Sequence, residues 1–130
     1  MFNHIMIGTN DIDKSKAFYE KVLKVLGVEA AMDNTTESGT KRVFFMHDGD
    51  VLALSQPIDG EPATCANGMT IGFKCSSPEQ VKELHDVAVA AGGTSIEDPP
   101  GLREGAMGSM HLSYFRDLDG HKLCGLYRVQ

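Results

Sequence analysis

The side chains of this sequence best suited to metal or nucleophilic chemistry are its histidines and cysteines. His4 lies in an apolar N-terminal segment, where an imidazole could be a metal ligand, a general base or a hydrogen-bonded core residue. Cys124 lies in an apolar segment near the other end. Its thiol could be a nucleophile if a nearby cation or helix N-terminus lowered its pKa. The apolar neighbours favour the other alternative, a buried and inert cysteine.

The remaining candidates have weaker signals. His47 and His121 stand at Asp/Gly turns, so we expect both to be solvated. His111 follows a glycine-rich segment and could reach the rim of a cavity. Arg103 and Arg116 could contact an anionic ligand.

Composition limits the classes of protein that can use these groups. With 130 residues, 42% of them hydrophobic, the chain forms one domain, residues 1–130. A net charge of −6 with no cluster of Lys and Arg argues against a nucleic-acid partner. No apolar run approaches the roughly 20 residues that span a bilayer, so we expect no membrane partner. The three cysteines lack CxxC spacing, which is typical of reduced thiols and favours a cytoplasmic location.

A repeated order of elements must position the candidate residues. Residues 2–7 predict a strand, Asn10 and Asp11 a helix start, and Gly27 the helix end. Residues 69–75 predict a strand again, Ser77 and Pro78 a second helix start, and Gly92 its end, 65 positions after Gly27 (92 − 27). Each half then closes with similar strand pairs, residues 43–55 and 112–126.

Two βαβββ modules, residues 1–65 and 66–130, therefore make up the chain. Each is too small to be stable alone, so we expect the two modules to pack together. The fold class is then α+β, with a curled mixed sheet around a cavity and helices on its outer face. Because strand side chains alternate, Ile5 and Ile7 would pack under the helices while His4 and Met6 face the cavity. The glycine-rich segment 101–109 is either a loop over the mouth of the cavity or a disordered connector.

Two motifs carry a resemblance to a known family. The opening Asn3-His4-Ile5-Met6, followed by residues 10–19 (NDIDKSKAFY), and the turn Phe115-Arg-Asp-Leu-Asp-Gly120 resemble the vicinal-oxygen-chelate superfamily over nearly the whole chain. That superfamily includes glyoxalase I, bleomycin-resistance proteins and extradiol dioxygenases. Pro100-Gly-Leu-Arg103 is similar to a glyoxalase-like bacterial subgroup. A homodimer is also implied by the resemblance.

The resemblance implies four metal-ligand positions, two on each module. They fall on His4, Ala53, Thr70 (or Met69, if the register slips) and Cys124, so one of the four residues matches and a cysteine replaces a carboxylate. One imidazole and a thiol lack the ligand count and charge of a stable divalent site. The Arg by which glyoxalase I holds the glutathione carboxylate falls on Gly8, so lactoylglutathione lyase activity is not expected.

Three hypotheses remain. The first is a small-molecule binder without the usual metal centre and with no cofactor, whose apolar cavity is lined by His4, Met6, Ala53, Thr70, Leu112, Tyr114 and Cys124. The second is a lyase, isomerase or dioxygenase, either with a divalent metal on a rebuilt ligand set of His4 and His111, or metal-free with Tyr114 or Cys124. The third is an interaction module with a vestigial cavity.

Overall fold

The computed structural model describes residues 1–29 and 31–130. In the first half the elements are β1 (Ile5–Gly8), α1 (Ile12–Lys24), β2 (Ala31–Thr35), β3 (Lys41–His47) and β4 (Asp50–Ser55). In the second half they are β5 (Ile71–Lys74), α2 (Pro78–Ala90), β6 (Thr94–Ser95), β7 (Gly101–Gly105), β8 (Gly108–Arg116) and β9 (Lys122–Arg128). The order repeats, with one additional strand in the second half, which confirms the predicted α+β fold.

Local signals begin and end both helices as the sequence predicts. Asp11 caps α1 by accepting a hydrogen bond from the Lys14 backbone N–H at 3.0 Å. Ser77 caps α2 by accepting one from the Gln80 backbone N–H at 3.1 Å. Gly27 follows α1 with φ +90°, a left-handed conformation that favours glycine.

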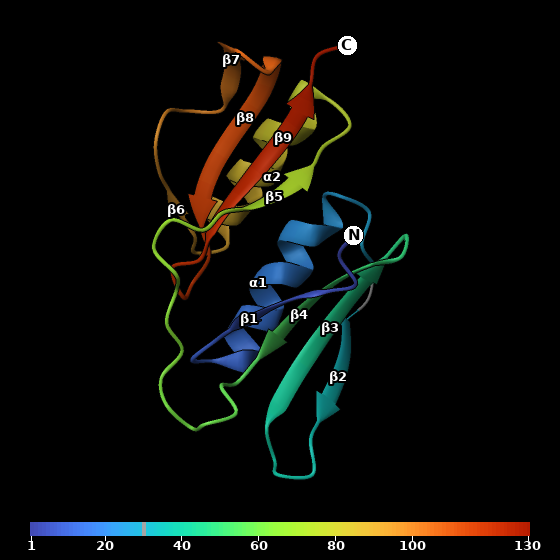
Figure 1. Ribbon diagram of the computed structural model, residues 1–130, viewed down its shortest axis with the longest axis vertical. Helices are drawn as coiled ribbons and strands as arrows, with labels where there is room; N and C mark the ends of the chain where they lie inside the picture. Colours follow the sequence, from blue (N-terminus) through green and yellow to red (C-terminus); the bar gives the residue numbers. More distant parts are fainter. Residues whose placement is uncertain (30) are drawn as a thin grey trace.

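Each half forms its own sheet. The strand orders are β1-β4-β3-β2 and β5-β9-β8-β6, with β7 also on β8. β1 pairs with β4, and β5 with β9, in parallel, while the other pairs are antiparallel. Among the described residues no strand pairing joins the two sheets, so the mixed sheet consists of two separate pieces, with β1 at the edge of one and β5 at the edge of the other (Figure 1).

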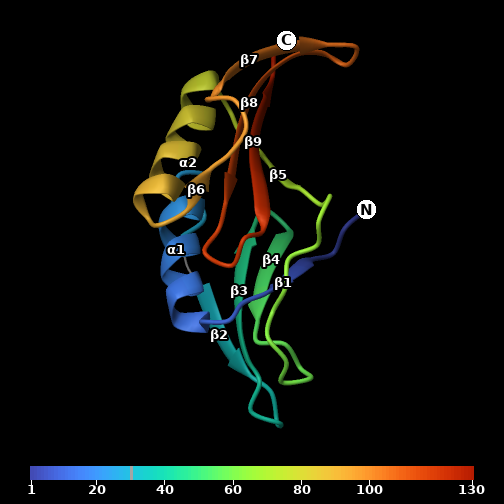
Figure 2. The ribbon, with the colours of Figure 1, turned by 90° about the vertical axis from the view of Figure 1, so that its left-hand side faces the viewer.

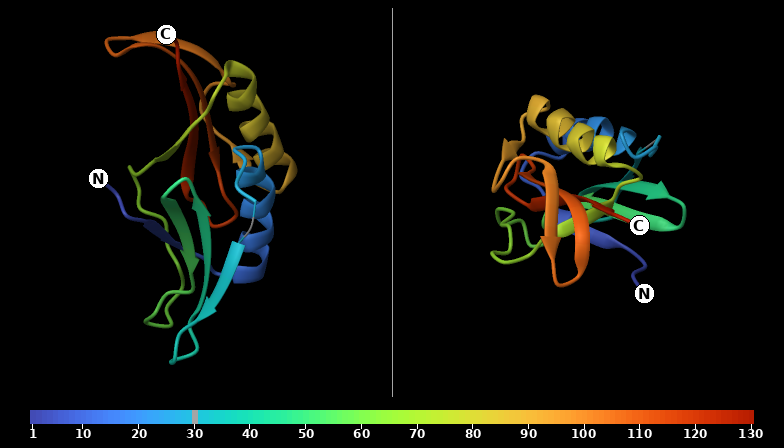
Figure 3. Two further views of the ribbon diagram at one scale, coloured as in Figure 1. Left: turned by 90° about the vertical axis from the view of Figure 1, so that its right-hand side faces the viewer. Right: turned by 90° about the horizontal axis from the view of Figure 1, so that it is seen from above.

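The two helices cover one side of both sheets, and the other side is open. Figure 2 and the left view of Figure 3 show α1 and α2 along one flank and the strands along the other. The hairpin of β7 and β8 arches away from the helices at one end of the molecule (Figure 3). The side of each sheet that faces away from the helices is called the open face below.

The core lies between helices and sheets. Its largest fully buried side chains include Tyr19, Phe18, Phe115, Leu54 and Leu84. The α1 and α2 helices pack on each other, and the Gln80 side chain donates a hydrogen bond to the Val25 carbonyl at 2.9 Å. The two modules therefore share one core, held together by side chains.

A second link between the modules is the turn between β8 and β9, residues 117–121, called the cross-module turn below. Asp117 is buried, and its Oδ2 accepts a hydrogen bond from the Tyr19 hydroxyl at 2.5 Å. Its Oδ1 accepts hydrogen bonds from the backbone N–H groups of Asp119 (3.0 Å) and His121 (2.9 Å). Asp119 in turn accepts one from the Asn10 backbone N–H at 2.8 Å. The turn thus binds to the segment that follows β1 and to the middle of α1.

Segment 101–109 is neither of the two structures predicted for it. It forms β7, the turn and the start of β8, with Gly101 opposite Leu112 and Gly105 opposite Gly108. Gly108 has φ +98°, which suits the tight turn. The glycines that suggested a loop are compatible with this hairpin because each ladder needs only the backbone N–H and C=O groups.

No helix among the described residues is long and apolar enough to cross a membrane.

Candidate functional site

Three of the predicted site residues belong to the first sheet. Met6 lies on β1 opposite Ala53 of β4, and Ala53 lies opposite Phe44 of β3. Ile5 and Ile7 pack toward the helices, so Met6 and Ala53 lie on the open face. His4 directly precedes β1, is exposed, and its Nδ1 lies 2.7 Å from the side-chain oxygen of Asn3.

The other four belong to the second sheet. Tyr114 lies opposite Cys124, which lies opposite Gly72. Leu112 follows the same alternation, two residues from Tyr114. Thr70 directly precedes β5, and because Ile71 is in the core, Thr70 and not Met69 points to the open side.

The Cys124 thiol is in a poor environment for ionisation. It is 4% exposed, and burial raises its pKa. Its Sγ lies 3.5 Å from the Gly125 carbonyl oxygen. The Lys122 ammonium, the nearest cation on the same face, lies 4.9 Å from the centre of the Tyr114 ring and pairs with Glu97. Cys124 is therefore a protonated thiol at neutral pH, which disfavours both nucleophilic and metal-binding roles.

The four positions implied as metal ligands do not fit a divalent ion. Ala53 has no donor atom, Thr70 offers a neutral hydroxyl and Cys124 a thiol with a raised pKa, so only His4 provides an effective ligand. Across residues 1–29 and 31–130 no three His, Cys, Asp or Glu side chains are grouped so that they could hold a metal ion.

A pocket of about 390 Å³ lies where the two sheets meet, and we call it the seam pocket. His4 and Thr70 reach it from the two modules. Its lining also includes, from the first module, Phe2, Asn3, Ile5, Asp50, Val51 and Leu52, and from the second, Ile71, Gly72 and Phe73. The lining is largely apolar with a few polar groups, as in many small-molecule sites.

The structure does not bring all seven predicted residues into this pocket. Met6 lines a different pocket, which also contains Arg42. Ala53, Leu112 and Cys124 are buried within the sheets, and Tyr114 is half-buried beside Lys122. The seven residues were predicted to line one cavity, whereas in the structure the two sheets carry separate pockets.

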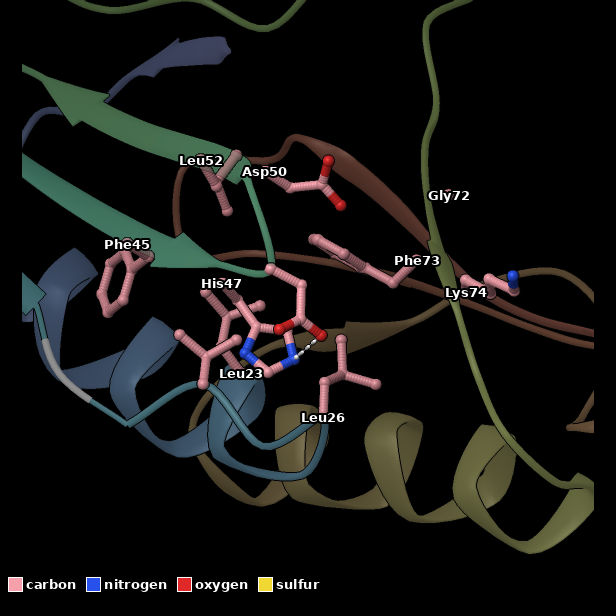
Figure 4. A pocket seen from close by; sticks show the side chains of 11 residues that line it. Leu23, Leu26, Phe45, His47, Asp50, Leu52, Gly72, Phe73 and Lys74 are labelled. Carbon is pink, nitrogen blue, oxygen red and sulfur yellow. Dashed lines mark ion pairs between the residues drawn. The ribbon is translucent and has the colours of Figure 1, made fainter. Parts of the chain in front are cut away.

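A second pocket, of about 400 Å³, lies on the helix side of the same seam (Figure 4). It shares Asp50, Leu52, Gly72 and Phe73 with the seam pocket. Leu23, Leu26 and Phe45 add an apolar wall, and Figure 4 shows Lys74 at one side. Gly72 supplies no side chain here, and a glycine within a predicted strand was the one available sequence signal for a space at this position.

The turn histidines differ from one another. His47 lines the helix-side pocket with a 43% exposed side chain, and its Nε2 lies 3.4 Å from the Asp48 carboxylate. The prediction that His121 is solvated is wrong. His121 is 3% exposed, and its Nε2 donates a hydrogen bond to the Gly8 carbonyl at 2.7 Å. The cross-module turn buries it against β1, a contact between positions 113 residues apart that local sequence does not indicate.

The other two groups of candidates have local partners. His111 lies on β8 opposite Tyr127, with ring centres 6.4 Å apart. Arg103 donates a hydrogen bond to the Pro99 carbonyl at 2.7 Å, and Arg116 donates one to the Gly120 carbonyl at 2.8 Å. Neither arginine lines the seam pocket.

Solved structures with the same fold are numerous. A glyoxalase/bleomycin resistance protein from Albidiferax ferrireducens T118 is 43% identical, with a TM-score of 0.91 over 98% of this chain and 99% of that one. A glyoxalase-related enzyme from Fulvimarina pelagi is 22% identical, with a TM-score of 0.72 over 98% and 88%. A mutant of the fosfomycin resistance protein FosX from Listeria monocytogenes, complexed with Mn(II) and 1S,2S-dihydroxypropylphosphonic acid, is 18% identical, with a TM-score of 0.69 over 99% and 93%.

No curated protein matches the chain significantly. The family model described as Glyoxalase/Bleomycin resistance protein/Dioxygenase superfamily matches residues 1–124, nearly the whole length. The order of elements, the parallel pairing of the first and last strands in each module and the motifs at both ends agree with that match. The chain belongs to the Glyoxalase/Bleomycin resistance protein/Dioxygenase superfamily.

Proposed function

We propose that this protein binds a small organic molecule in the seam pocket, without the usual metal centre of its superfamily. The observation that carries the proposal is the pocket itself, about 390 Å³, with apolar walls and His4 and Thr70 contributed by the two modules. A volume of this size suits a molecule of one or two rings. The two polar side chains would orient a hydroxyl or carbonyl group of the ligand.

The chemistry of the ligand positions supports binding over metal-assisted turnover. A metal enzyme needs several charged or strongly donating ligands and an open coordination site. His4 is the one strong donor among the four positions, so the first condition is not met. Cys124 remains a neutral thiol because burial raises its pKa.

The experiment is a ¹H–¹⁵N NMR titration of the protein with 1-naphthol, a neutral aromatic probe. We expect saturable shifts at the backbone amides of residues 3–5, 50–52 and 70–73. Gly72→Leu places a side chain in the pocket and should abolish the shifts, and a Cβ at Gly72 meets no atom within 4 Å. Gly105→Leu is the matched control, because Gly105 is equally open but lies on β7. Equal binding by both variants, or no saturable shift in the wild type, would contradict the proposal.

We also propose that the protein is a cytoplasmic homodimer. Two methionines on the first sheet's open face, Met32 and Met46, are each 51% exposed. Flexible apolar side chains grouped on one sheet face are suited to packing against a second copy. Light scattering after size exclusion tests the mass, and a monomer at micromolar concentration would refute the dimer.

A further inference from the structure

Arg42 is the one arginine on the open face of the first sheet. It lies on β3 with Ser55 of β4 on one side and Asn34 of β2 on the other. The residue is only partly exposed. In the part of the chain that the structure describes, its side chain forms no ion pair and no hydrogen bond, and its Nε is buried without a partner.

The buried, unpaired Nε of Arg42 is costly. A buried donor that loses its hydrogen bond to water and gains none from the protein costs about 1–3 kcal/mol, and more if charged. Arginine cannot relieve the cost by losing its proton. Of the guanidinium nitrogens only Nε is buried without a partner, whereas the two Nη groups keep accessible surface and form no hydrogen bond or ion pair in the described structure. A negatively charged acceptor in the pocket can therefore pair with these Nη groups.

The surrounding pocket has room for such an acceptor. It has a volume of about 370 Å³, and Arg42 lines it together with Met6 and Gly8 of β1, Ser55 of β4 and Thr64 of the segment that follows. Within residues 1–29 and 31–130 the Thr64 hydroxyl has no hydrogen-bond partner, so it is available to a ligand. No residue lines both this pocket and the seam pocket.

The wall formed by residues 56–64 is held in place. The Asn10 side chain donates to the Ala63 carbonyl at 3.2 Å and accepts from the Ala63 backbone N–H at 2.7 Å. A Cβ on Gly8 would lie 3.1 Å from the Ala63 side chain, which shows how closely this segment packs on β1. The pocket is therefore preorganised, which lowers the entropic cost of binding.

One carboxylate, Asp59, lines the same pocket and must be considered as a competing partner. No ion pair joins it to Arg42 in the described structure, and its Oδ1 accepts a hydrogen bond from the Glu61 backbone N–H at 2.9 Å. Asp59 is exposed, so water satisfies the rest of its charge. The arginine therefore remains available to an external anion.

We propose that this pocket is a binding site for a small oxyanion, a carboxylate or a phosphate, held by the Arg42 guanidinium. The planar fork of arginine matches two oxygens of either group and gives short, charge-assisted hydrogen bonds. The net charge of −6 gives the protein no general attraction for anions, so binding here depends on the local arrangement.

The test is a ¹H–¹⁵N NMR titration with inorganic phosphate and, separately, with acetate at constant ionic strength. We expect saturable shifts of the Arg42 Nε–H signal and of the amides of residues 55–64 with at least one of the two anions. Arg42→Gln should weaken binding by about tenfold or more. Arg103→Gln is the matched control, because Arg103 is on the second sheet and bonds to the Pro99 carbonyl, and it should bind as the wild type does.

A second readout separates a lost site from a misfolded variant. Because Arg42 has no partner to lose, Arg42→Gln should melt at or above the wild-type temperature and should still bind 1-naphthol. Shifts that do not saturate, or equal phosphate and acetate affinities in Arg42→Gln and wild type, would overturn the proposal. Failure of 1-naphthol binding alone would refute the seam-pocket function and leave the anion site standing.

Discussion

Replacing Tyr19 by Phe isolates the hydrogen bond through which the cross-module turn is attached to α1. The hydroxyl is fully buried and donates to Asp117 Oδ2 at 2.5 Å. The substitution keeps the ring, including its edge-on packing against Phe18 at 5.1 Å between ring centres and its contact with Phe45 at 6.3 Å. The change is therefore limited to one hydroxyl and one bond.

The expected loss of stability follows from the Asp117 oxygen that the substitution leaves without its donor. Asp117 Oδ1 keeps its two backbone donors, while Oδ2 becomes a carboxylate oxygen without its donor in a residue that is 4% exposed. Hydrogen bonds to charged groups contribute about 1.5–3 kcal/mol, so Tyr19→Phe should lower the free energy of unfolding by about 2–3 kcal/mol. For a domain of this size we expect a melting temperature lower by about 7 to 11 °C.

The pH dependence gives a sharper test of the same bond. Burial first, and then the charge of Asp117, raise the pKa of Tyr19 well above its ordinary value of 10.0. A raised folded-state pKa means that the stabilisation is fully present below pH 10 and is lost as the pH rises through the folded-state pKa. Above pH 10 the difference between wild type and Tyr19→Phe should therefore shrink, by up to about 1.4 kcal/mol per pH unit.

The assay is urea unfolding followed by circular dichroism between pH 7 and pH 11, for wild type, Tyr19→Phe and the control Tyr127→Phe. Tyr127 is only partly buried, and its hydroxyl has no partner in the described structure, so its variant should stay within about 0.5 kcal/mol of wild type. A Tyr19→Phe loss below 1 kcal/mol, or a difference from wild type that does not change above pH 10, would refute the role assigned to this bond.

Three further predictions test the packing, the thiols and the metal. Gly93→Ala should lower the free energy of unfolding by about 2–3 kcal/mol, because its Cβ would lie 2.7 Å from the Arg116 carbonyl oxygen. Gly105→Ala is the control, since a Cβ there meets no atom within 4 Å and the variant should be as stable as the wild type. Equal melting temperatures of the two variants would contradict this prediction. Iodoacetamide should modify the exposed Cys65 in the native protein but modify the buried Cys124, whose pKa is raised, only in denaturant. Mass spectrometry of protein digests identifies the modified cysteines. Equal rates of modification of the two cysteines in the native protein would show that Cys124 is reactive. Elemental analysis of protein purified without added metal or a His-tag should find far less than one equivalent of divalent ion. Added Zn²⁺ or Mn²⁺ should not raise the melting temperature. A bound ion that is lost in His4→Ala would mean instead that other residues complete a metal site around His4.

The helices and the module repeat could be predicted because their signals are local. Asp11, Ser77 and Gly27 act within one turn of the chain, and the structure confirms the helix starts and the helix end that they indicate. Alternation along β1 likewise placed Met6 on the face away from the core. In each case the information lies within a few residues of the position it determines.

The site was less accessible from sequence because it depends on contacts between distant segments. The seam pocket joins residues 2–5, 50–52 and 70–73, and nothing in any one of them shows that the sheets meet edge to edge. The partners of Tyr19 and His121 lie 98 and 113 positions away. Arg42 occupies a strand where its lack of a partner becomes evident only once its neighbours on β2 and β4 are known.

The two ends of the seam between the modules are built differently. At the C-terminal end of β1 and the middle of α1, the cross-module turn fastens the modules with three hydrogen bonds, of which the one from Tyr19 is buried. At the N-terminal end of β1 and the last turn of α1, pockets lie on both sides of the seam. The hydrogen bond from Gln80 to Val25 also joins the modules at this end, on the helix side. An occupant of the seam pocket, on the open side, should therefore act as a wedge that sets the angle between the two halves.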